Sequence, residues 1–243
     1  MFGNPRMLGA VTLAGLLIAV NWTIYVGAVV SHHVTEASLG YFLNPIVTVA
    51  IGVVVLRERL RRLQWLAVAI GLGAGVYLSV DLGRPPWIAV GLALSFALYG
   101  LMKKRIGTSL GAFQSLTSET AVLLPIALAI LVWVEVSGQS TFAVDSPSHP
   151  LLLASAGMVT AGPLLLFAAA ARRVPLVTIG LLQFITPVLQ LLCGVLILGE
   201  TMKTSRWIGF GIVWVALLVL TIDSIRSIRS RRRLAGAAEC TAV

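Results

Sequence analysis

EASLGYFLNPIVTVAIGVVVLRERLRRLQW, from Glu36 to Trp65, decides the organisation of the chain, because its pattern returns later in the sequence. In it, an apolar run that contains a proline ends in a carboxylate, a basic cluster and a tryptophan. The stretch GLLQFITPVLQLLCGVLILGETMKTSRW, from Gly180 to Trp207, has the same order. One offset of 142 residues (187 − 45 = 142) aligns seven landmark pairs, which are Phe42 and Phe184, Pro45 and Pro187, Gly52 and Gly194, Leu56 and Leu198, Glu58 and Glu200, Trp65 and Trp207, and Asp81 and Asp223. This shared register predicts a two-fold internal repeat.

The composition indicates an all-α polytopic membrane protein. Apolar residues make up 58% of the chain and charged residues 11%, whereas an ordinary soluble domain has about 25% charged residues. The apolar runs are long enough for membrane-spanning helices rather than barrel strands. Eight spans are expected, roughly at Met7–Val30, Ala37–Leu56, Leu63–Val80, Pro86–Met102, Ser115–Val136, Pro150–Ala171, Leu176–Leu198 and Arg206–Ile222.

The basic residues predict the orientation of these spans. Loops on one side collect fifteen of the 18 Lys and Arg residues, among them the run Lys103 to Arg105, and the other side holds Arg84, Lys203 and Arg206. Basic residues concentrate on the cytoplasmic side of membrane proteins, so we expect both termini in the cytoplasm. The net charge of +9 follows from the same rule and requires no nucleic-acid partner.

Orientation makes the repeat an inverted one. The span that contains Pro45 runs inward, and the span that contains Pro187 runs outward, so equivalent helices point in opposite directions. Inverted repeats are typical of carriers in which one central site faces either side of the membrane in turn. We therefore expect alternating-access transport of a small molecule.

Particular residues resemble a known family. The run HHVTEASLGYFLNP, the later LRERLRRLQWLAVAIG, the pair Asn21-Trp22, the triplet Ser118-Glu119-Thr120 and the run from Gln183 to Pro187 are similar to the RarD branch of the EamA (drug/metabolite transporter) family. The resemblance covers nearly the whole chain before the final basic tail. It implies a ten-helix inner-membrane carrier, five helices per repeat, for small metabolites or drugs. The RarD name implies a chloramphenicol-sensitivity phenotype, and it does not give the substrate.

The offset and the resemblance together predict the domain limits. We expect an incomplete first repeat of three helices at residues 1–81, a second repeat of five helices at 86–224, and a basic cytoplasmic tail at 225–243. Applying the offset to Pro86 places the start of the first repeat upstream of Met1. The bundle is thus expected to be a 5+5 arrangement that lacks its first two helices, and the reading frame is expected to extend upstream.

Polar residues inside the spans are candidates for a substrate pathway. Glu119 lies about two turns into an outward-running span, where a carboxylate is costly unless it faces a cavity or a partner. It is a candidate for proton exchange or for contact with a cationic solute. The alternative is that the span starts later and that Glu119 lies at the membrane interface. Asn21, Trp22 and Tyr25 in the first span offer an amide and two aromatic rings. The alternative for the amide is hydrogen bonding between helices.

The two aligned prolines indicate a second group of candidates. A proline lacks a backbone N–H and frees a carbonyl one turn earlier, and Gln183 lies four residues before Pro187. Helices opened at matching places in two inverted halves are typical of a binding site at the membrane midplane. The first-half candidates are Asn44, which precedes Pro45, and Tyr41, which aligns with Gln183 in the same register (183 − 142 = 41).

Residues near the ends of spans have structural interpretations. His32, His33 and Glu36 have spacing that allows a metal site, but Thr35 as a helix cap with Glu36 in the first turn is favoured. Glu58 and Glu200 are expected to anchor loops beside Arg61 and Lys203. No metal, cofactor or nucleotide motif is recognised in the sequence.

These observations favour a secondary transporter over two rival classes, a membrane scaffold or accessory subunit and an integral-membrane lipid enzyme. The expected partners are a small-molecule substrate and the lipid bilayer. Proton coupling and a homodimer are left open by the sequence.

Overall fold

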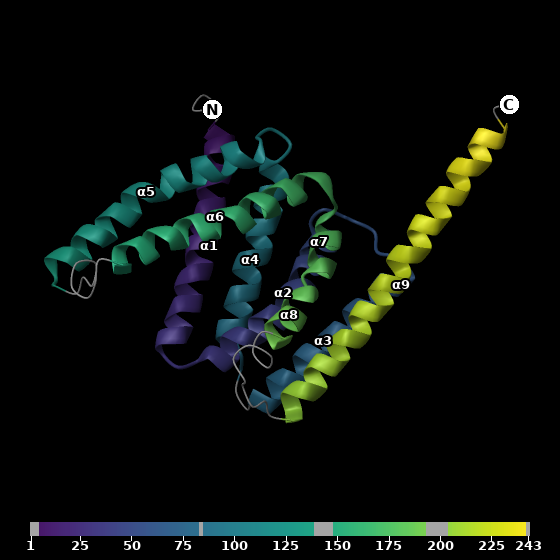
Figure 1. The fold of residues 1–243 in the computed structure, drawn as a ribbon, viewed down its shortest axis with the longest axis horizontal. Helices are drawn as coiled ribbons and strands as arrows, with labels where there is room; N and C mark the ends of the chain where they lie inside the picture. The colour runs from purple at the N-terminus through teal and green to yellow at the C-terminus, as the bar shows by residue number, and fades with distance from the viewer. Residues whose placement is uncertain (1–4, 83–84, 139–147, 193–203, 242–243) are drawn as a thin grey trace. The chain divides into compact units, whose positions relative to one another are not determined.

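The protein is all α-helical wherever the computed structural model describes it, namely residues 5–82, 85–138, 148–192 and 204–241 (Figure 1). This confirms the all-α prediction. The helices are α1 (Pro5–Val30), α2 (Val34–Val54), α3 (Arg62–Leu82), α4 (Trp87–Ile106), α5 (Ala112–Val136), α6 (Ser148–Arg173), α7 (Leu176–Leu182), α8 (Ile185–Leu192) and α9 (Thr204–Thr241).

Within those ranges, the six helices α1 to α6 are long and apolar enough to cross a membrane. The chain is therefore a multi-pass membrane protein. The expected seventh span is divided into α7 and α8, and its last residues, 193–198, lie outside the described ranges. The expected eighth span lies within α9, whose apolar part, Trp207–Asp223, is shorter than the six full spans. The total of eight spans remains a prediction.

One expectation at a helix end needs correction. The cap of α2 is His33, which makes no side-chain capping bond, so the prediction of a Thr35 cap is wrong. Glu36 is buried, and its Oε1 accepts a hydrogen bond of 2.8 Å from the backbone N–H of Ile88, in the first turn of α4. The segment expected as a separate basic tail continues the backbone of α9 as far as Thr241.

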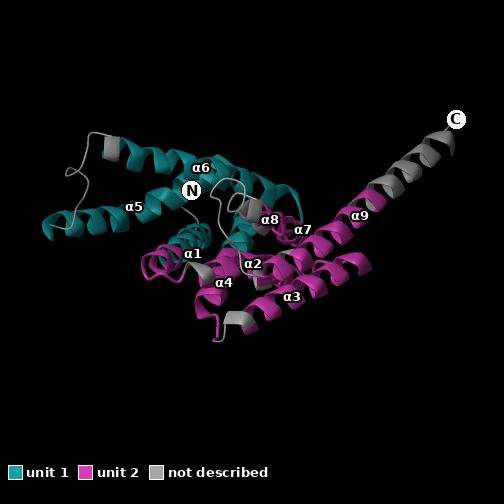
Figure 2. Ribbon diagram, turned by 60° about the horizontal axis from the view of Figure 1, so that its bottom comes forward, with its two compact units in different colours: residues 1–23, 98–175 teal, residues 24–97, 176–243 magenta. Residues whose placement is uncertain are grey.

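The helices fall into two compact units, coloured in Figure 2, and each unit draws on both repeats of the sequence. Unit 1 contains residues 1–23 and 98–175, and unit 2 contains residues 24–97 and 176–243. The division between the units falls within α1 and within α4, so each of these two helices contributes residues to both units.

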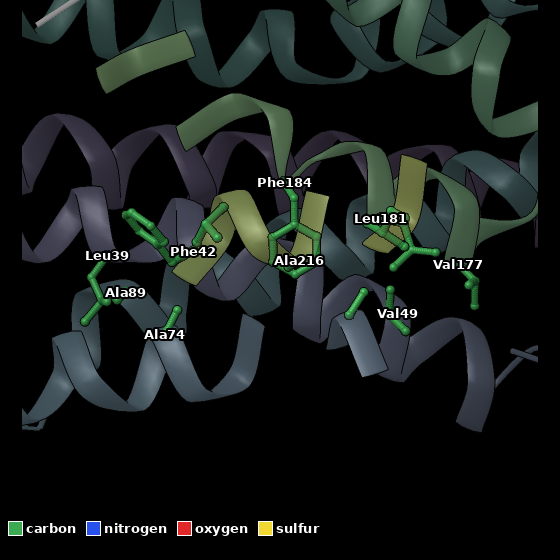
Figure 3. Packing of buried hydrophobic residues seen from close by; sticks show 12 residues of the cluster. Leu39, Phe42, Val49, Ala74, Ala89, Val177, Leu181, Phe184 and Ala216 are labelled. Carbon is green, nitrogen blue, oxygen red and sulfur yellow. The ribbon is translucent and has the colours of Figure 1, made fainter. Parts of the chain in front are cut away.

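Unit 2 has an apolar core built from α2, α3, α4, α7 and α9 together with the residue Phe184 (Figure 3). Phe184 is fully buried between α7 and α8, and Gly71 in α3 makes room for its ring. A Cβ atom at position 71 would lie 2.4 Å from Phe184 Cζ, so no larger residue fits without a shift. Within this unit α2 packs against α7, and α3 packs against α9.

Unit 1 is held together by a close helix approach and by basic side chains. Gly15 of α1 faces Leu123 of α5, and an added Cβ would lie 3.4 Å from Leu123 Cγ. At the end of α6, Arg172 Nε donates a 2.9 Å hydrogen bond to the carbonyl of Gly107, in the turn between α4 and α5. Lys104 similarly donates to the carbonyl of Val174. These bonds fix the α4–α5 hairpin against the end of α6.

Candidate functional site

A buried ion pair occupies the α4–α5 hairpin of unit 1. Lys103 Nζ lies 2.6 Å from Glu119 Oε1, and the two side chains are 1% and 2% exposed. Ser115 completes a triangle, because its hydroxyl lies 2.9 Å from Lys103 Nζ and 2.8 Å from Glu119 Oε1. The carboxylate of Glu119 therefore has a cation belonging to the protein itself.

Two aromatic rings enclose this pair. Tyr99 is fully buried, and its hydroxyl donates a 3.4 Å hydrogen bond to Glu119 Oε2. The Lys103 ammonium lies 5.4 Å from the centroid of the Tyr99 ring, a distance at which a cation is attracted to the ring face. The Tyr99 ring also stacks on Phe167 of α6 with a centroid separation of 5.8 Å.

Helix geometry explains how these groups meet. Tyr99 and Lys103 are four residues apart on α4, and Ser115 and Glu119 are four residues apart on α5, so each pair lies on one helix face. The short connection 107–111 turns the two faces toward each other. Burying two charges is costly unless both are paired and hydrogen-bonded, and both conditions are met here.

Trp22 and Thr120 lie on a groove of unit 1 that is distinct from the ion pair. The groove has a volume of about 350 Å³ and is lined by Trp22, Leu116, Thr120, Ala156, Gly157, Thr160, Ala161 and Leu164. Glu119 is not one of its lining residues, because its side chain points to Lys103 and Tyr99. Asn21, next to Trp22, is half-buried. Another hollow, of about 450 Å³, is lined by five apolar residues of α5 alone and has no polar group to orient a ligand.

The helix that contains Pro187 is interrupted in unit 2. α7 ends at Leu182 and α8 begins at Ile185. Across the interruption, the backbone N–H of Gln183 donates to the carbonyls of Ile179 and Gly180, and the N–H of Thr186 donates to the carbonyl of Gln183 at 3.0 Å. Position 187 cannot supply the N–H that would continue the helix, because proline has none.

The side chain of Gln183 reaches α2 at this interruption. Its Oε1 accepts a 3.2 Å hydrogen bond from the hydroxyl of Thr48, which is buried. Tyr41, Asn44 and Thr48 are spaced to lie on one face of α2. Tyr41 packs edge-on against Tyr25, with ring centroids 6.3 Å apart. Unit 2 thus contains four sequence candidates, which are Tyr25, Tyr41, Asn44 and Gln183.

Asn44 presents a buried acceptor. Its Oδ1 has no hydrogen-bond partner among the described residues. A buried carbonyl oxygen without a partner costs free energy, and such atoms attract a donor from water or a ligand. Asn44 Oδ1 is therefore a buried acceptor that the described residues leave unsatisfied.

The aligned prolines differ in their local structure. α2 continues without interruption through Pro45, whereas the helix before Pro187 is broken. Gly180 of α7 lies against α2, where an added Cβ would be 3.0 Å from the carbonyl oxygen of Pro45. Gly52 of α2 reciprocally lies against Val177 of α7. Small residues on both helices permit this close crossing.

Glu58, which lies in the connection between α2 and α3, caps the start of α7. Its two carboxylate oxygens accept hydrogen bonds from the backbone N–H groups of Leu176 at 2.8 Å and Val177 at 2.7 Å. The first N–H groups of a helix have no partner within the helix, so this carboxylate satisfies the start of α7. Arg61, which was expected beside Glu58, instead forms a 2.8 Å ion pair with Asp223 of α9. Glu200 lies outside the described residues.

Sequence reasoning missed Lys103, Tyr99 and Thr48. Lys103 was assigned to a cytoplasmic loop, but it lies in the last turn of α4 and is buried. The matching four-residue spacings on either side of a short turn were a signal that could have identified the cluster. In the described part of the chain, no group of three or more His, Cys, Asp or Glu residues is placed to hold a metal ion.

The six apolar spans and the buried polar groups between them define a polytopic helical membrane protein, and its sequence relationships show which family it represents. The profile of the EamA-like transporter family matches residues 1–80 and 86–222. The chain therefore belongs to the EamA-like transporter family, in its RarD branch. It is a membrane transporter.

Named relatives agree with this assignment. The chain is 53% identical over 236 residues to Protein RarD of Streptomyces exfoliatus, an alignment that covers 97% of this chain and 74% of the relative. It is 41% identical over 223 residues to Protein RarD of Escherichia coli (strain K12), covering 91% and 74%. It is 33% identical over 234 residues to the chloramphenicol-sensitive protein RarD of Pseudomonas aeruginosa, covering 96% and 77%.

A solved crystal structure also resembles this chain. The TM-score is 0.59 at 18% sequence identity, and the match covers 90% of this chain and 89% of the other. At this level of identity the likeness shows the fold alone.

Proposed function

We propose that the protein is an inner-membrane secondary transporter that moves small metabolites or drugs by alternating access. The observation that carries this proposal is the interruption between α7 and α8, where Gln183 forms a hydrogen bond with Thr48 of α2. Broken helices whose polar groups meet a neighbouring helix are typical of solute sites in secondary transporters. Catalysis is not part of the proposal.

Packing within unit 2 supports an inverted 5+5 repeat with eight spans in this chain. α2 and α7 are equivalent under the 142-residue offset and pack against each other, and so are α3 and α9. A two-fold axis in the membrane plane would produce this pairing of equivalent helices. The proposed domain limits are 1–81, 86–224 and 225–243, and both termini are proposed to be cytoplasmic.

The residues proposed for the solute pathway are mostly uncharged. Tyr25, Tyr41, Asn44 and Gln183 offer aromatic faces and amide or hydroxyl groups, which suit a neutral, partly aromatic solute. The name of the Pseudomonas aeruginosa relative makes chloramphenicol a reasonable first compound to test. Asn21 and Trp22 are proposed to contribute in unit 1.

Glu119 is proposed as the site of proton coupling. Its buried pair with Lys103 is a place where protonation of the carboxylate would release a fixed cation.

Homodimer formation is a separate part of the proposal and is tested by the mass of the purified protein in detergent.

The decisive experiment is transport by purified protein in sealed vesicles. Radiolabelled chloramphenicol is supplied with and without a proton gradient, and empty vesicles serve as the blank. We expect saturable movement that Gln183→Leu abolishes and that Glu135→Gln, at an exposed carboxylate of α5, leaves intact. Absence of transport by the wild-type chain with any gradient would contradict the proposal and favour an accessory subunit, while turnover of lipid would favour an enzyme.

Topology is tested separately. Reporter fusions after Arg62, Arg105 and Arg233 should be cytoplasmic, and a fusion near Asp145 should be external. A cytoplasmic result near Asp145 would contradict the proposed orientation.

A further inference from the structure

The groove of unit 1 has a chemical character that narrows the ligands it can accept. α1 contributes Trp22, α5 contributes Leu116 and Thr120, and α6 contributes a floor that includes Gly157 and Thr160. Its volume of about 350 Å³ is at the lower end of the roughly 300–1,000 Å³ range of small-molecule sites. It therefore suits a small metabolite rather than a peptide or a folded partner.

The hydroxyl groups of Thr120 and Thr160 can accept hydrogen bonds from a ligand but cannot donate to it. The Thr120 hydroxyl donates to the carbonyl of Leu116 at 3.0 Å, and the Thr160 hydroxyl donates to the carbonyl of Ala156 at 2.7 Å. A hydroxyl has one hydrogen and two acceptor lone pairs, so each oxygen retains only acceptor capacity. A ligand that hydrogen-bonds to these oxygens must bring the hydrogen itself.

The rest of the groove selects by shape and charge. Trp22 is 46% exposed and presents an aromatic surface, while Ala156, Gly157 and Ala161 have side chains too small to obstruct a flat ring. None of the eight lining residues is charged, and none supplies a free side-chain hydroxyl hydrogen for an anion. The only side-chain donor among the lining residues that is not already used is the indole N–H of Trp22, so a carboxylate in this groove would lose most of its hydration for at most one hydrogen bond.

We propose that this groove binds a flat, uncharged small molecule that donates hydrogen bonds to Thr120 and Thr160 while its ring lies against Trp22. The proposal rests on the proposed transport function, since it names the class of substrate. A lipid acyl chain is the rival occupant, because it also fills an apolar groove in a membrane. The two occupants differ because an acyl chain has no donor for the hydroxyl oxygens of Thr120 and Thr160.

The experiment is equilibrium dialysis of nitroaromatic probes against the full chain in lipid nanodiscs, with empty nanodiscs as the blank. The probes are 4-nitrobenzyl alcohol, which donates one hydrogen bond, its methyl ether, which donates none, and 4-nitrobenzoate, an anion. The alcohol should bind saturably, and the ether should bind about fivefold more weakly, as expected for the loss of one hydrogen bond. The benzoate should show no saturable binding.

The chain offers a matched pair of filling variants on α6. A Cβ atom at Gly157 or at Gly162 would meet no atom within 4 Å, so both positions accept a larger side chain without a clash. Gly157 lines the groove and Gly162 does not. Gly157→Leu should abolish saturable binding of the alcohol, and Gly162→Leu should leave it unchanged.

A second pair of variants keeps the shape and removes the acceptors. The double variant Thr120→Val with Thr160→Val should bind the alcohol and the ether equally. Equal binding of these two probes by the wild-type chain, equal effects of the two glycine variants, or uptake that never saturates would each overturn the proposal. Uptake that never saturates would show that the probe partitions into the bilayer and has no site in the groove. Dialysis requires no translocation, so a chain that binds the alcohol but moves no solute in vesicles would refute the transport function and leave the groove standing.

Discussion

Unit 1 and unit 2 handle buried polarity in opposite ways. Unit 1 places a full ion pair, Lys103 with Glu119, inside the hairpin of α4 and α5, where both side chains are almost inaccessible. Unit 2 joins neutral groups, Thr48 of α2 and Gln183 at the interruption between α7 and α8. Three carboxylates of unit 2 also contact other segments. Glu36 and Glu58 accept hydrogen bonds from the first turns of α4 and α7, and Asp223 of α9 pairs with the partly exposed Arg61. Unit 1 therefore depends on exact charge balance, whereas unit 2 tolerates small changes in its polar contacts.

The largest effect should come from removing one charge in unit 1. Glu119→Leu leaves the Lys103 ammonium buried without its counterion, so the free energy of unfolding should fall by about 3–5 kcal/mol. Unfolding in mixed micelles, followed by circular dichroism, measures this change. The double variant Lys103→Met with Glu119→Leu should recover most of the loss, because no charge then remains buried. Simple addition of two single losses would contradict this account.

A smaller effect is expected at the cap of α7. Glu58→Ala removes both acceptors of the Leu176 and Val177 N–H groups, and hydrogen bonds to a charged group contribute about 1.5–3 kcal/mol. We expect a loss of about 2 kcal/mol in the same unfolding assay, within the range for lost caps. Glu135→Ala, an exposed carboxylate of α5, is the control and should change little. An equal effect of both variants would argue against capping.

The neutral contact in unit 2 should matter less for stability than either carboxylate. Thr48→Val removes the donor to Gln183, and a neutral hydrogen bond contributes about 1 kcal/mol. Thr23→Val, at a threonine whose hydroxyl donates to the carbonyl of Ala19 in its own helix, controls for the loss of a helix hydroxyl. The comparison between units would fail if Thr48→Val were as damaging as Glu119→Leu.

The smallest effect is predicted for the partly exposed ion pair of unit 2. The Arg61 side chain is 47% exposed although that of Asp223 is 8% exposed, and exposed pairs contribute less than about 1 kcal/mol. Arg61→Gln should lower the free energy of unfolding by that amount or less, and salt should weaken the difference further. A loss comparable to that of Glu119→Leu would show that this pair is screened from water.

The sequence predicted the helices well, because composition and apolar run length decide them locally. Expected spans such as Met7–Val30 and Pro150–Ala171 lie within α1 and α6. The opening of the helix before Pro187 was also predicted, because proline has no backbone N–H. These are local properties that a neighbouring helix does not reverse.

The partners of the polar side chains could not be predicted, because they depend on tertiary packing. Lys103 looked like a loop charge, and only the facing turn of α5 makes it the counterion of Glu119. Glu36 and Glu58 looked like local anchors. In the structure they accept hydrogen bonds from backbone N–H groups at the starts of other helices, 52 and 118 residues away in sequence. A hydrophobic pattern contains no information on which distant N–H group a carboxylate will reach.

The Glu58 cap also has a consequence for the order of synthesis. Leu176 emerges from the ribosome 118 residues after Glu58, and at about 5–20 residues per second this takes on the order of ten seconds. During that interval the carboxylate has no α7 to cap, and the face of α2 that will contact α7 is uncovered. The early helices must therefore rest in the bilayer with temporary partners, such as water, lipid headgroups or the insertion machinery, until the second half arrives to replace them.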